Sequence, residues 1–235
     1  MPNQISIISA ITDVINRSSI YSESKGIIEV EKLYYIPNGL DDFKQKIPVD
    51  KFKADKLIRQ EDSFFDIKLN DGRWQLSDTD HFIRIRKIYD TDGIFQKGEI
   101  KIGYPGLMSN HNIRFSPAEK LTEGPAIEWC RYLTFIGFEI ERQYKKQRIP
   151  FISKQKYQNF DVELEVDRFD DNECNRKLAG ISFSTISVET DGIRRIEAEQ
   201  ALIDAKKDIE KTGIILKECT GNYEDYFYCR KNLPT

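Results

Sequence analysis

The chain has 235 residues with 36 basic and 39 acidic side chains, a formal net charge of −3 and a 39% hydrophobic fraction. This composition fits a folded globule, and the lack of a basic excess argues against a general nucleic-acid-coating role. No run of about 18 apolar residues is present that could span a membrane. Two histidines, and four cysteines without a CxxC pair, argue against a zinc centre or a disulfide framework, so we expect a cytoplasmic protein with reduced thiols.

The elements predicted in chain order begin with an amphipathic helix over 4–17, inside an N-terminal extension of residues 1–26. Residues 27–235 are predicted to form one domain. Alternating polar and apolar residues predict strands over 27–35, 63–67, 81–89, 98–104, 138–144, 147–152, 159–169 and 183–190. Helices are predicted over 48–60, 126–136 and 193–212, with a short terminal helix over 222–231. Runs of strands with few helices between them indicate an α+β fold, mostly antiparallel.

Charges of one sign gather on single faces of individual strands. Glu29 and Glu31 share one face, Arg84 and Arg86 share another, and acidic residues alternate through 159–169. Like charges two residues apart repel, and a solvent-facing sheet has no reason to sort them by strand. The sorting is explained if the strands face one another across an interior. We therefore expect a closed or nearly closed antiparallel barrel, a tunnel with a charged lumen and helices packed outside.

Such a lumen would offer two kinds of ligand group. Clustered carboxylates suit a hard divalent cation such as Mg²⁺ or Mn²⁺. Arginine and lysine bind phosphate oxygens, arginine in a bidentate manner. Cations gathered at close range repel one another, so carboxylates or a bound anion must compensate them. Together these groups predict a small-molecule ligand made of a metal and a polyphosphate. The alternative is a set of ordinary strands whose polar faces meet solvent.

A series of short segments then occurs in a definite order: IEVEKLY, SFFDI, DTDHFIRIR, GEIKIGYPG, FIGFEIERQYKKQR, DVELEVD and ISVET followed by IEAEQALIDA. In this order they resemble the signature strands of the CYTH superfamily, the triphosphate tunnel metalloenzymes, which include class IV adenylate cyclases and thiamine triphosphatases. The first segment is similar to the Glu-x-Glu-x-Lys signature of that family. The resemblance extends over roughly 27–215.

The resemblance implies a function for three sets of side chains. Phosphate would be bound by Arg84, Arg86, Lys101, Lys146 and Arg148. An oxygen-ligand site for Mg²⁺ or Mn²⁺ would be formed by Glu29, Glu31, Glu163, Glu165 and Glu189. The candidate catalytic residues are Glu31, Lys101 and Arg148. The carboxylates would hold the metal that orients water, and the cations would neutralise charge as it develops on the phosphates.

Two positions depart from the family pattern. Leu33 stands where the signature has lysine, while the adjacent Lys32 points to the opposite face of a regular strand. Ser187 stands in place of one acid of the closing Glu-x-Glu. Four functions therefore remain open: a metal-dependent hydrolase of inorganic, nucleotide or thiamine triphosphate; a class IV-type adenylate cyclase; a non-catalytic triphosphate sensor; and a polar barrel without a ligand. In each case we expect no nucleic-acid or membrane partner, and a homodimer is left open.

Overall fold

A computed structural model describes residues 27–77, 81–103, 107–108, 114–117, 120–124, 126–169, 178–188 and 192–219. The predicted extension over 1–26 and the predicted terminal helix over 222–231 lie outside these residues.

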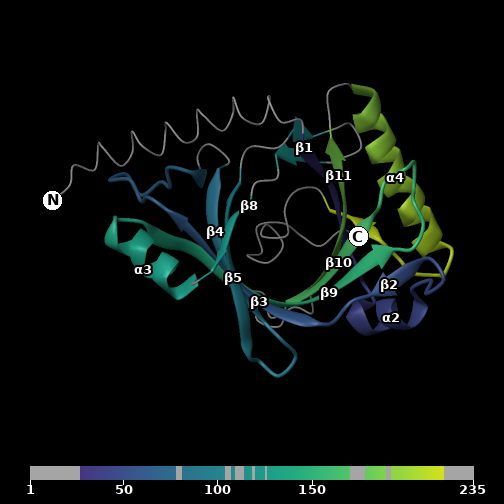
Figure 1. Ribbon diagram of the computed structural model, residues 1–235, viewed down its shortest axis with the longest axis horizontal. Coiled ribbons are helices and arrows are strands. Elements are labelled where there is room, and N and C mark those ends of the chain that lie inside the picture. Colours follow the sequence, from purple (N-terminus) through teal and green to yellow (C-terminus); the bar gives the residue numbers. More distant parts are fainter. Residues whose placement is uncertain are drawn as a thin grey trace.

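The described residues form one antiparallel sheet flanked by helices, which confirms the predicted α+β class (Figure 1). The elements are β1 (Ile27–Tyr35), α2 (Gly39–Lys46), β2 (Phe52–Ala54), β3 (Ile58–Asp66), β4 (Phe82–Tyr89), β5 (Phe95–Gly103), β6 (Leu107–Met108), β7 (Arg114–Pro117), β8 (Lys120–Gly124), α3 (Ala126–Phe135), β9 (Glu139–Ser153), β10 (Glu163–Phe169), β11 (Leu178–Val188), α4 (Gly192–Glu210) and β12 (Lys217–Glu218). The strand order is β6-β7-β1-β11-β10-β9-β3-β4-β5-β8, with β12 paired to β1 and β2 paired to β9.

The sheet is deeply curved, so that one of its faces encloses a lumen. Lys101 on β5 and Glu29 on β1 are six steps apart in the strand order, yet their side chains form an ion pair at 3.2 Å. In a flat sheet, strands six steps apart would be separated by about 29 Å. The curvature must therefore bring these two walls together, and Figure 1 shows the strands following an arc.

The predicted closed barrel is only partly supported. The strands at the two ends of the order, β6 and β8, are not joined by backbone hydrogen bonds among the residues that the structure describes. The lumen is enclosed by curvature and by side-chain contacts across it, such as the pair between Lys101 and Glu29, rather than by a continuous hydrogen-bonded ladder.

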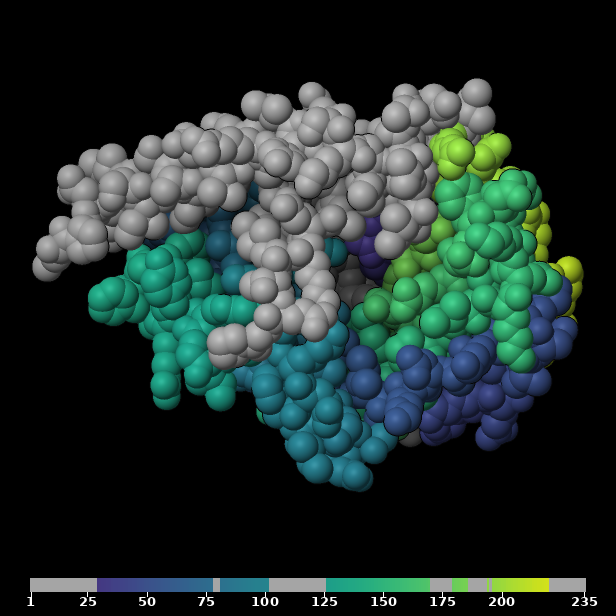
Figure 2. Space-filling model, in the orientation of Figure 1, coloured from purple at the N-terminus to yellow at the C-terminus, as the bar shows by residue number. Residues whose placement is uncertain are grey.

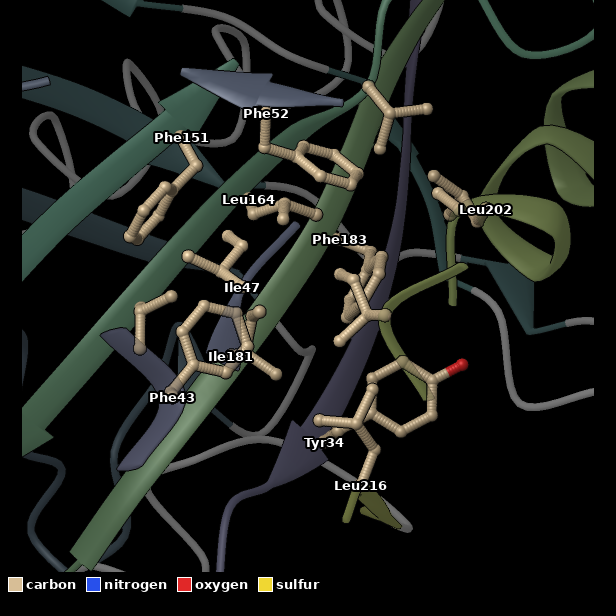
Figure 3. Close-up of a cluster of buried hydrophobic side chains, with 14 of the residues drawn as sticks. Tyr34, Phe43, Ile47, Phe52, Phe151, Leu164, Ile181, Phe183, Leu202 and Leu216 are labelled. Atoms are coloured by element: carbon tan, nitrogen blue, oxygen red, sulfur yellow. The ribbon is translucent and has the colours of Figure 1, made fainter. Parts of the chain in front are cut away.

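The outer face of the sheet carries the main apolar core. Val30 and Tyr34 alternate with the acidic residues of β1 and pack outward, toward Phe183 of β11 and Leu202 of α4 (Figure 3). The rings of Tyr34 and Phe183 meet edge to face with their centroids 5.1 Å apart. Because successive side chains of a strand point to opposite faces, burying these residues under α4 directs their polar neighbours into the lumen.

The other two helices cover the outer face at different strands. Phe43 of α2 meets Phe151 of β9 edge to face, with a centroid distance of 5.7 Å. Leu133 of α3 belongs to a separate apolar cluster with Phe65 of β3 and Ile85 of β4. The helices thus pack outside the sheet, as predicted from the charge pattern. None of the helices in the described residues is both long and apolar enough to span a bilayer.

The predicted helix over 48–60 is wrong. The helix lies earlier, as α2, and residues 52–54 form β2 at the edge of β9. Phe52 is buried against Tyr157, with ring centroids 6.2 Å apart, and the backbone N–H of Asp55 donates to Pro150 at 2.8 Å. Hydrogen bonding to β9 therefore replaces the helical hydrogen bonds that the local charge spacing suggested. The two strands predicted over 138–144 and 147–152 are one continuous strand, β9.

A matched pair of substitutions in α4 tests this packing. Leu202 is 1% exposed and faces the sheet, whereas Ile196, on the same helix, is 68% exposed. We expect Leu202→Ala to lower the free energy of unfolding by about 2–5 kcal/mol, because it leaves a cavity in the core. Ile196→Ala should change it by less than about 0.5 kcal/mol. Urea unfolding followed by circular dichroism measures both, and equal losses would contradict this placement of the helix.

Candidate phosphate-binding site

The strand register gathers basic side chains on the lumen face. In antiparallel strands, directly opposite residues share a face. The Arg84 and Arg86 side chains of β4 therefore lie on the same face as those of β3 and β9 that follow in register. We call the four lumen-facing cations on β4 and β9 the cation cluster: Arg84, Arg86, Lys146 and Arg148. Lys101 lies opposite Arg84 on β5 and extends this face.

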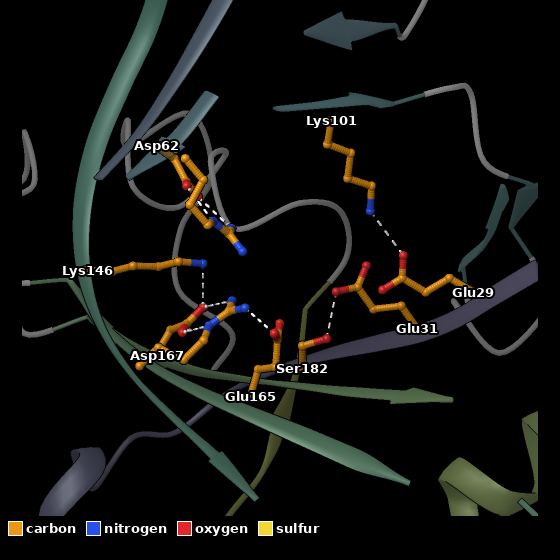
Figure 4. A network of polar contacts seen from close by, with 10 residues as sticks. Glu29, Glu31, Asp62, Lys101, Lys146, Glu165, Asp167 and Ser182 are labelled. Carbon is orange, nitrogen blue, oxygen red and sulfur yellow. Dashed lines mark hydrogen bonds and ion pairs between the residues drawn. The ribbon is translucent and has the colours of Figure 1, made fainter. Parts of the chain in front are cut away.

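A buried aspartate of β3 neutralises one arginine of the cation cluster. Asp62 lies opposite Arg86, whose Nε donates to Oδ1 at 2.6 Å and whose Nη2 donates to Oδ2 at 2.7 Å (Figure 4). Burial opposes the charge of Asp62, but the positive charges of Arg86 and Arg84 outweigh it and hold the pKa of Asp62 well below its usual range. Burial likewise lowers the pKa of Arg86, but Asp62 outweighs it and raises that pKa above the ordinary value.

A second buried aspartate serves two cations at once. Arg148 donates from Nε and Nη2 to the two oxygens of Asp167, each at 2.6 Å, and Lys146 Nζ donates to Oδ2 at 2.8 Å. Arg148 also contacts Glu165. Burial tends to raise the pKa of Asp167, but Arg148 and Lys146 outweigh it and lower that pKa. Burial and the charge of Arg148 lower the pKa of Lys146.

These two aspartates are the compensating carboxylates that the sequence required without identifying. Asp167 lies on the acidic face predicted for residues 159–169, although no role was predicted for it. Asp62 was missed altogether, because its position opposite Arg86 depends on the register between β3 and β4, which no local pattern reveals. Its sequence signal is limited to its place directly before the strand predicted over 63–67.

One buried nitrogen of the cation cluster, the Nε of Arg84, has no hydrogen-bond acceptor in the described part of the chain. Burial and the neighbouring Arg86 lower the pKa of Arg84. An arginine that is held in this way next to other cations favours an anion at this end of the lumen.

Four glutamates lie farther along the same lumen. We call this set the acidic rim: Glu29, Glu31, Glu163 and Glu165. Glu29 pairs with Lys101, and Glu31 accepts a hydrogen bond from the hydroxyl of Ser182 at 2.6 Å (Figure 4). Burial raises the pKa of Glu163, and the negative charges of Glu165 and Glu29 raise it further. The walls formed by β1 and β10 are therefore close enough for their charges to interact.

The acidic rim has the donor chemistry that a hard divalent cation requires, since all of its ligand atoms are carboxylate oxygens. The repulsion that raises the pKa of Glu163 is also one that a bound cation would relieve. In the described part of the chain, no three histidine, cysteine, aspartate or glutamate side chains are already arranged to hold a metal ion. Glu189 lies outside the described residues, so the predicted five-carboxylate ligand set stays a prediction.

The departure at position 33 now has a physical explanation. Leu33 points into the lumen but packs against an apolar cluster that contains Phe64, Tyr144 and Phe169. An ammonium group at this position would lose its hydration against aromatic rings. Lys32 points outward, as expected from strand alternation, and its Nζ pairs with Glu218 of β12 at 2.9 Å. The side chain of Ser187 is outside the described part of the structure.

Comparison with solved structures identifies the fold. The chain superposes on the PH1819 protein from Pyrococcus horikoshii OT3 with a TM-score of 0.60 and 16% identity, over 86% of this chain and 99% of that one. A conserved hypothetical protein from Pyrococcus furiosus superposes with a TM-score of 0.50 and 18% identity, over 77% of this chain and 90% of that one. A candidate adenylate cyclase from Vibrio parahaemolyticus superposes with a TM-score of 0.51 and 16% identity, over 79% of this chain and 90% of that one. No protein-family model and no curated protein matches the sequence.

These likenesses support the resemblance drawn from the sequence at the level of the fold. The chain shares its fold with these solved structures. Its lumen carries the charged side chains on which that resemblance was based, placed by the register described above.

The buried aspartates predict how stability depends on pH. The lowered pKa values of Asp62 and Asp167 mean that the unfolded chain binds protons more tightly than the folded one. Their contribution is therefore fully present above the unfolded pKa of about 3.9 and is lost as the pH falls toward the folded values. We expect the free energy of unfolding to be nearly constant between about pH 7 and pH 5 and to decrease below about pH 4.

Asp62→Asn provides the matched comparison. The variant should be less stable than the parent by about 3–5 kcal/mol at pH 7, because Arg86 loses its buried counter-charge. It should also lose less stability on acidification, since one carboxyl group with a lowered pKa has been removed. Urea unfolding at a series of pH values measures both quantities. Parallel pH profiles for the parent and the variant would show that Asp62 does not carry this dependence.

Proposed function

We propose that the lumen binds the phosphate chain of a triphosphate-containing small molecule and that, with Mg²⁺ or Mn²⁺, the protein hydrolyses a phosphoric anhydride bond of this ligand. The observation that carries the proposal is the buried Nε of Arg84, which has no hydrogen-bond acceptor among the described residues and lies beside three further cations. A buried charge without a partner is unfavourable, and a polyphosphate would supply the missing acceptor oxygens.

The chain's own residues divide the work of binding. Arg84 offers a buried Nε that has no acceptor among the described residues, whereas Arg86 uses Nε and Nη2 to hold Asp62. Asp62 and Asp167 act as positioning residues, because a bidentate contact fixes the plane of a guanidinium. Phosphate oxygens would thus meet donors that are already oriented, and binding would require little further ordering.

Lys101 connects the two halves of the lumen. Its Nζ lies 3.2 Å from Glu29 of the acidic rim, while its backbone position is opposite Arg84 of the cation cluster. It can therefore reach either a carboxylate or a phosphate oxygen. The acidic rim would hold a divalent cation, whose contribution when bound is to neutralise charge on the phosphate oxygens.

A second candidate is a non-catalytic sensor that binds a triphosphate without hydrolysing it. The observation that favours it is Leu33, because the position of the signature lysine is occupied by a side chain packed among aromatic rings. The same lumen would bind the ligand, but it would lack one cation that the family pattern places there.

A product screen tests the proposal directly. Purified protein is incubated with tripolyphosphate, thiamine triphosphate or ATP, each with Mg²⁺ and with Mn²⁺, and both phosphate and cyclic AMP are measured. Metal-dependent phosphate release supports the hydrolase. Cyclic AMP from ATP would instead assign a cyclase, the activity suggested for the Vibrio parahaemolyticus neighbour. Binding without turnover would assign the sensor, and the absence of binding would refute all three.

Arg84 provides a test that separates binding from folding. Because its Nε has no hydrogen-bond partner among the described residues, Arg84→Met should leave the free energy of unfolding unchanged or raise it. The same change should weaken tripolyphosphate binding at least about tenfold, since hydrogen bonds between charged groups contribute about 1.5–3 kcal/mol. Calorimetric titration and urea unfolding provide the two measurements. Arg59→Met is the matched control, because Arg59 is an exposed arginine of β3. Equal affinities for both variants would argue against an anion at Arg84.

Glu31 tests the acidic rim. An amide can still accept the hydrogen bond from Ser182, so Glu31→Gln should preserve the fold while removing one negative charge. We expect metal-dependent phosphate release to fall by about tenfold or more, with a higher metal concentration needed for half-maximal rate. Phosphate release that persists in excess chelator, or that is unaffected by Glu31→Gln, would show that the acidic rim does not hold the metal.

A further inference from the structure

A glutamine of β3 is buried in the lumen, and its amide oxygen has no hydrogen-bond partner. Gln60 is 4% exposed, and its Oε1 accepts no hydrogen bond from the residues that the structure describes. It precedes Asp62 by two positions, so the two side chains share the lumen face of the strand. A buried amide oxygen without a donor is unfavourable, and such a group in a folded protein calls for a physical explanation.

The residues opposite Gln60 on the two adjacent strands explain why its Oε1 receives no donor. On β4 it lies opposite Ile88, an apolar side chain with no group to donate. On β9 it lies opposite Lys146, whose Nζ donates to Asp167 at 2.8 Å. A charged carboxylate is a stronger acceptor than a neutral amide, so the aspartate competes successfully for this ammonium group.

Two arginines complete the surroundings of the amide. Arg86 and Arg148 are diagonal neighbours of Gln60 across the sheet, at a separation that long side chains can span. Their Nε and Nη2 groups are donated to Asp62 and to Asp167 respectively, at 2.6–2.7 Å. Gln60 therefore lies between two sets of ion pairs, as an acceptor that neither set uses.

The two sets of ion pairs lie close together. Burial lowers the pKa of Lys146, and the charge of Arg86, which belongs to the other set, is among the causes that lower it further. Figure 4 shows the side chain of Lys146 between those of Asp62 and Asp167. A phosphate group bound by these cations would therefore lie beside Gln60.

A phosphate chain cannot supply the donor that Gln60 lacks, because ionised phosphate oxygens are themselves acceptors. A water molecule can supply it, since one O–H can point to Oε1 while a lone pair of the water stays available. Water has a route into the lumen. The side chains of Glu29 and Glu165 in the acidic rim are 28% and 31% exposed, and Figure 2 shows the surface hollowed beside β1 (purple) and the neighbouring green strands.

We propose that Gln60 holds the water molecule that attacks the terminal phosphorus of the bound phosphate chain. This inference rests on the proposed function and adds a residue to it. The water oxygen forms a bond to phosphorus while the bond from phosphorus to the bridging oxygen breaks, and the bridging oxygen keeps the electron pair. One proton of the water stays on the released orthophosphate, and the other passes to solvent. Gln60 accepts a hydrogen bond but no proton, and so fixes the direction of attack.

The test compares the full chain with its Gln60→Met and Gln60→Glu variants, using tripolyphosphate. Phosphate release at saturating substrate with Mg²⁺ or Mn²⁺ gives kcat, and calorimetric titration without metal gives the affinity. Methionine is similar in size but is a poor acceptor, so we expect kcat to fall by about tenfold or more while the affinity changes by less than about threefold. Glutamate keeps an acceptor oxygen, so kcat of Gln60→Glu should exceed that of Gln60→Met, although the added charge should weaken tripolyphosphate binding.

Stability and a matched control add two further measurements. Because Oε1 has no donor among the described residues, Gln60→Met should leave the urea midpoint of unfolding unchanged or raise it. Gln75→Met is the control, since Gln75 also has a buried Oε1 without a hydrogen-bond partner but lies in the loop that follows β3. From Gln60 to Asp66, where that loop begins, the strand rises by about 20 Å. We expect Gln75→Met to keep the kcat of the parent.

Each result leads to a decision. An unchanged kcat in Gln60→Met, or equal losses of kcat in Gln60→Met and Gln60→Glu, would overturn the role of Gln60 while leaving the proposed hydrolase intact. So would an affinity that falls as much as kcat, which would make Gln60 a phosphate contact. A Gln60→Met protein that fails to fold would show that the amide is satisfied within the fold, and would overturn the role as well. A parent that releases no phosphate would refute the hydrolase and this role together.

Discussion

The pairing of buried aspartates with buried cations is the constraint on which this structure depends. Curving the sheet brings Arg86, Lys146 and Arg148 together in a poorly solvated space, where like charges repel strongly. Asp62 and Asp167 lie between them, completely buried, with contacts of 2.6–2.8 Å. Removing one partner from such a pair costs about 3–5 kcal/mol, because the remaining charge is left buried and alone. These pairs therefore compensate the positive charge that the strands gather on the lumen face.

Each strand has one face in the apolar core and the other in the charged lumen, because successive side chains point to opposite faces. On β1, Val30 and Tyr34 pack under α4, whereas Glu29 and Glu31 point into the lumen. A register shift of one residue would exchange these faces, placing carboxylates in the apolar core and apolar side chains beside the cations. The apolar core outside and the charge pairs inside thus specify the same register independently, which gives a consistent fold despite the high charged fraction of the sequence.

The sequence predicts the features of this molecule that are local, and it misses those that depend on register. The bounds of β1 were predicted because the alternation of 27–35 is uninterrupted, and α3 and α4 end where Gly137 and Gly213 adopt positive φ angles of 101° and 82°. Like charges sorted by strand predicted an enclosed charged face. The partner of Arg86 could not be predicted, because it is Asp62 only in the register that the folded sheet adopts.

The apolar cluster on the lumen face, which contains Phe64, Tyr144 and Phe169 with Phe82 packed against it, and the false helix over 48–60 illustrate the same limit. Phe64 and Phe82 have the pattern of ordinary core residues, and nothing in their local sequence shows that they face the lumen rather than the outer core. The segment around Phe52 has charges at helical spacing, but the free edge of β9 offers its backbone hydrogen bonds that a helix would have had to supply. Tertiary contacts override local preference in both cases.

The two halves of the lumen would favour ligands of opposite charge: an anion at the cation cluster and a cation at the acidic rim. Burial and a neighbouring cation lower the pKa of Arg84, and an anion bound at this end would relieve the repulsion between the cations. Burial and neighbouring carboxylates raise the pKa of Glu163, and a cation bound at the rim would relieve this repulsion. A polyphosphate alone would supply the anion at the cation cluster but bring more negative charge toward the acidic rim. A metal alone would supply the cation at the acidic rim but bring more positive charge toward the cation cluster. In the proposed function the two together would satisfy both, since the acidic rim would hold the metal and the cation cluster would hold the phosphate oxygens. Each should therefore tighten the binding of the other, and since this coupling is reciprocal, the affinity of either depends equally on the presence of its partner.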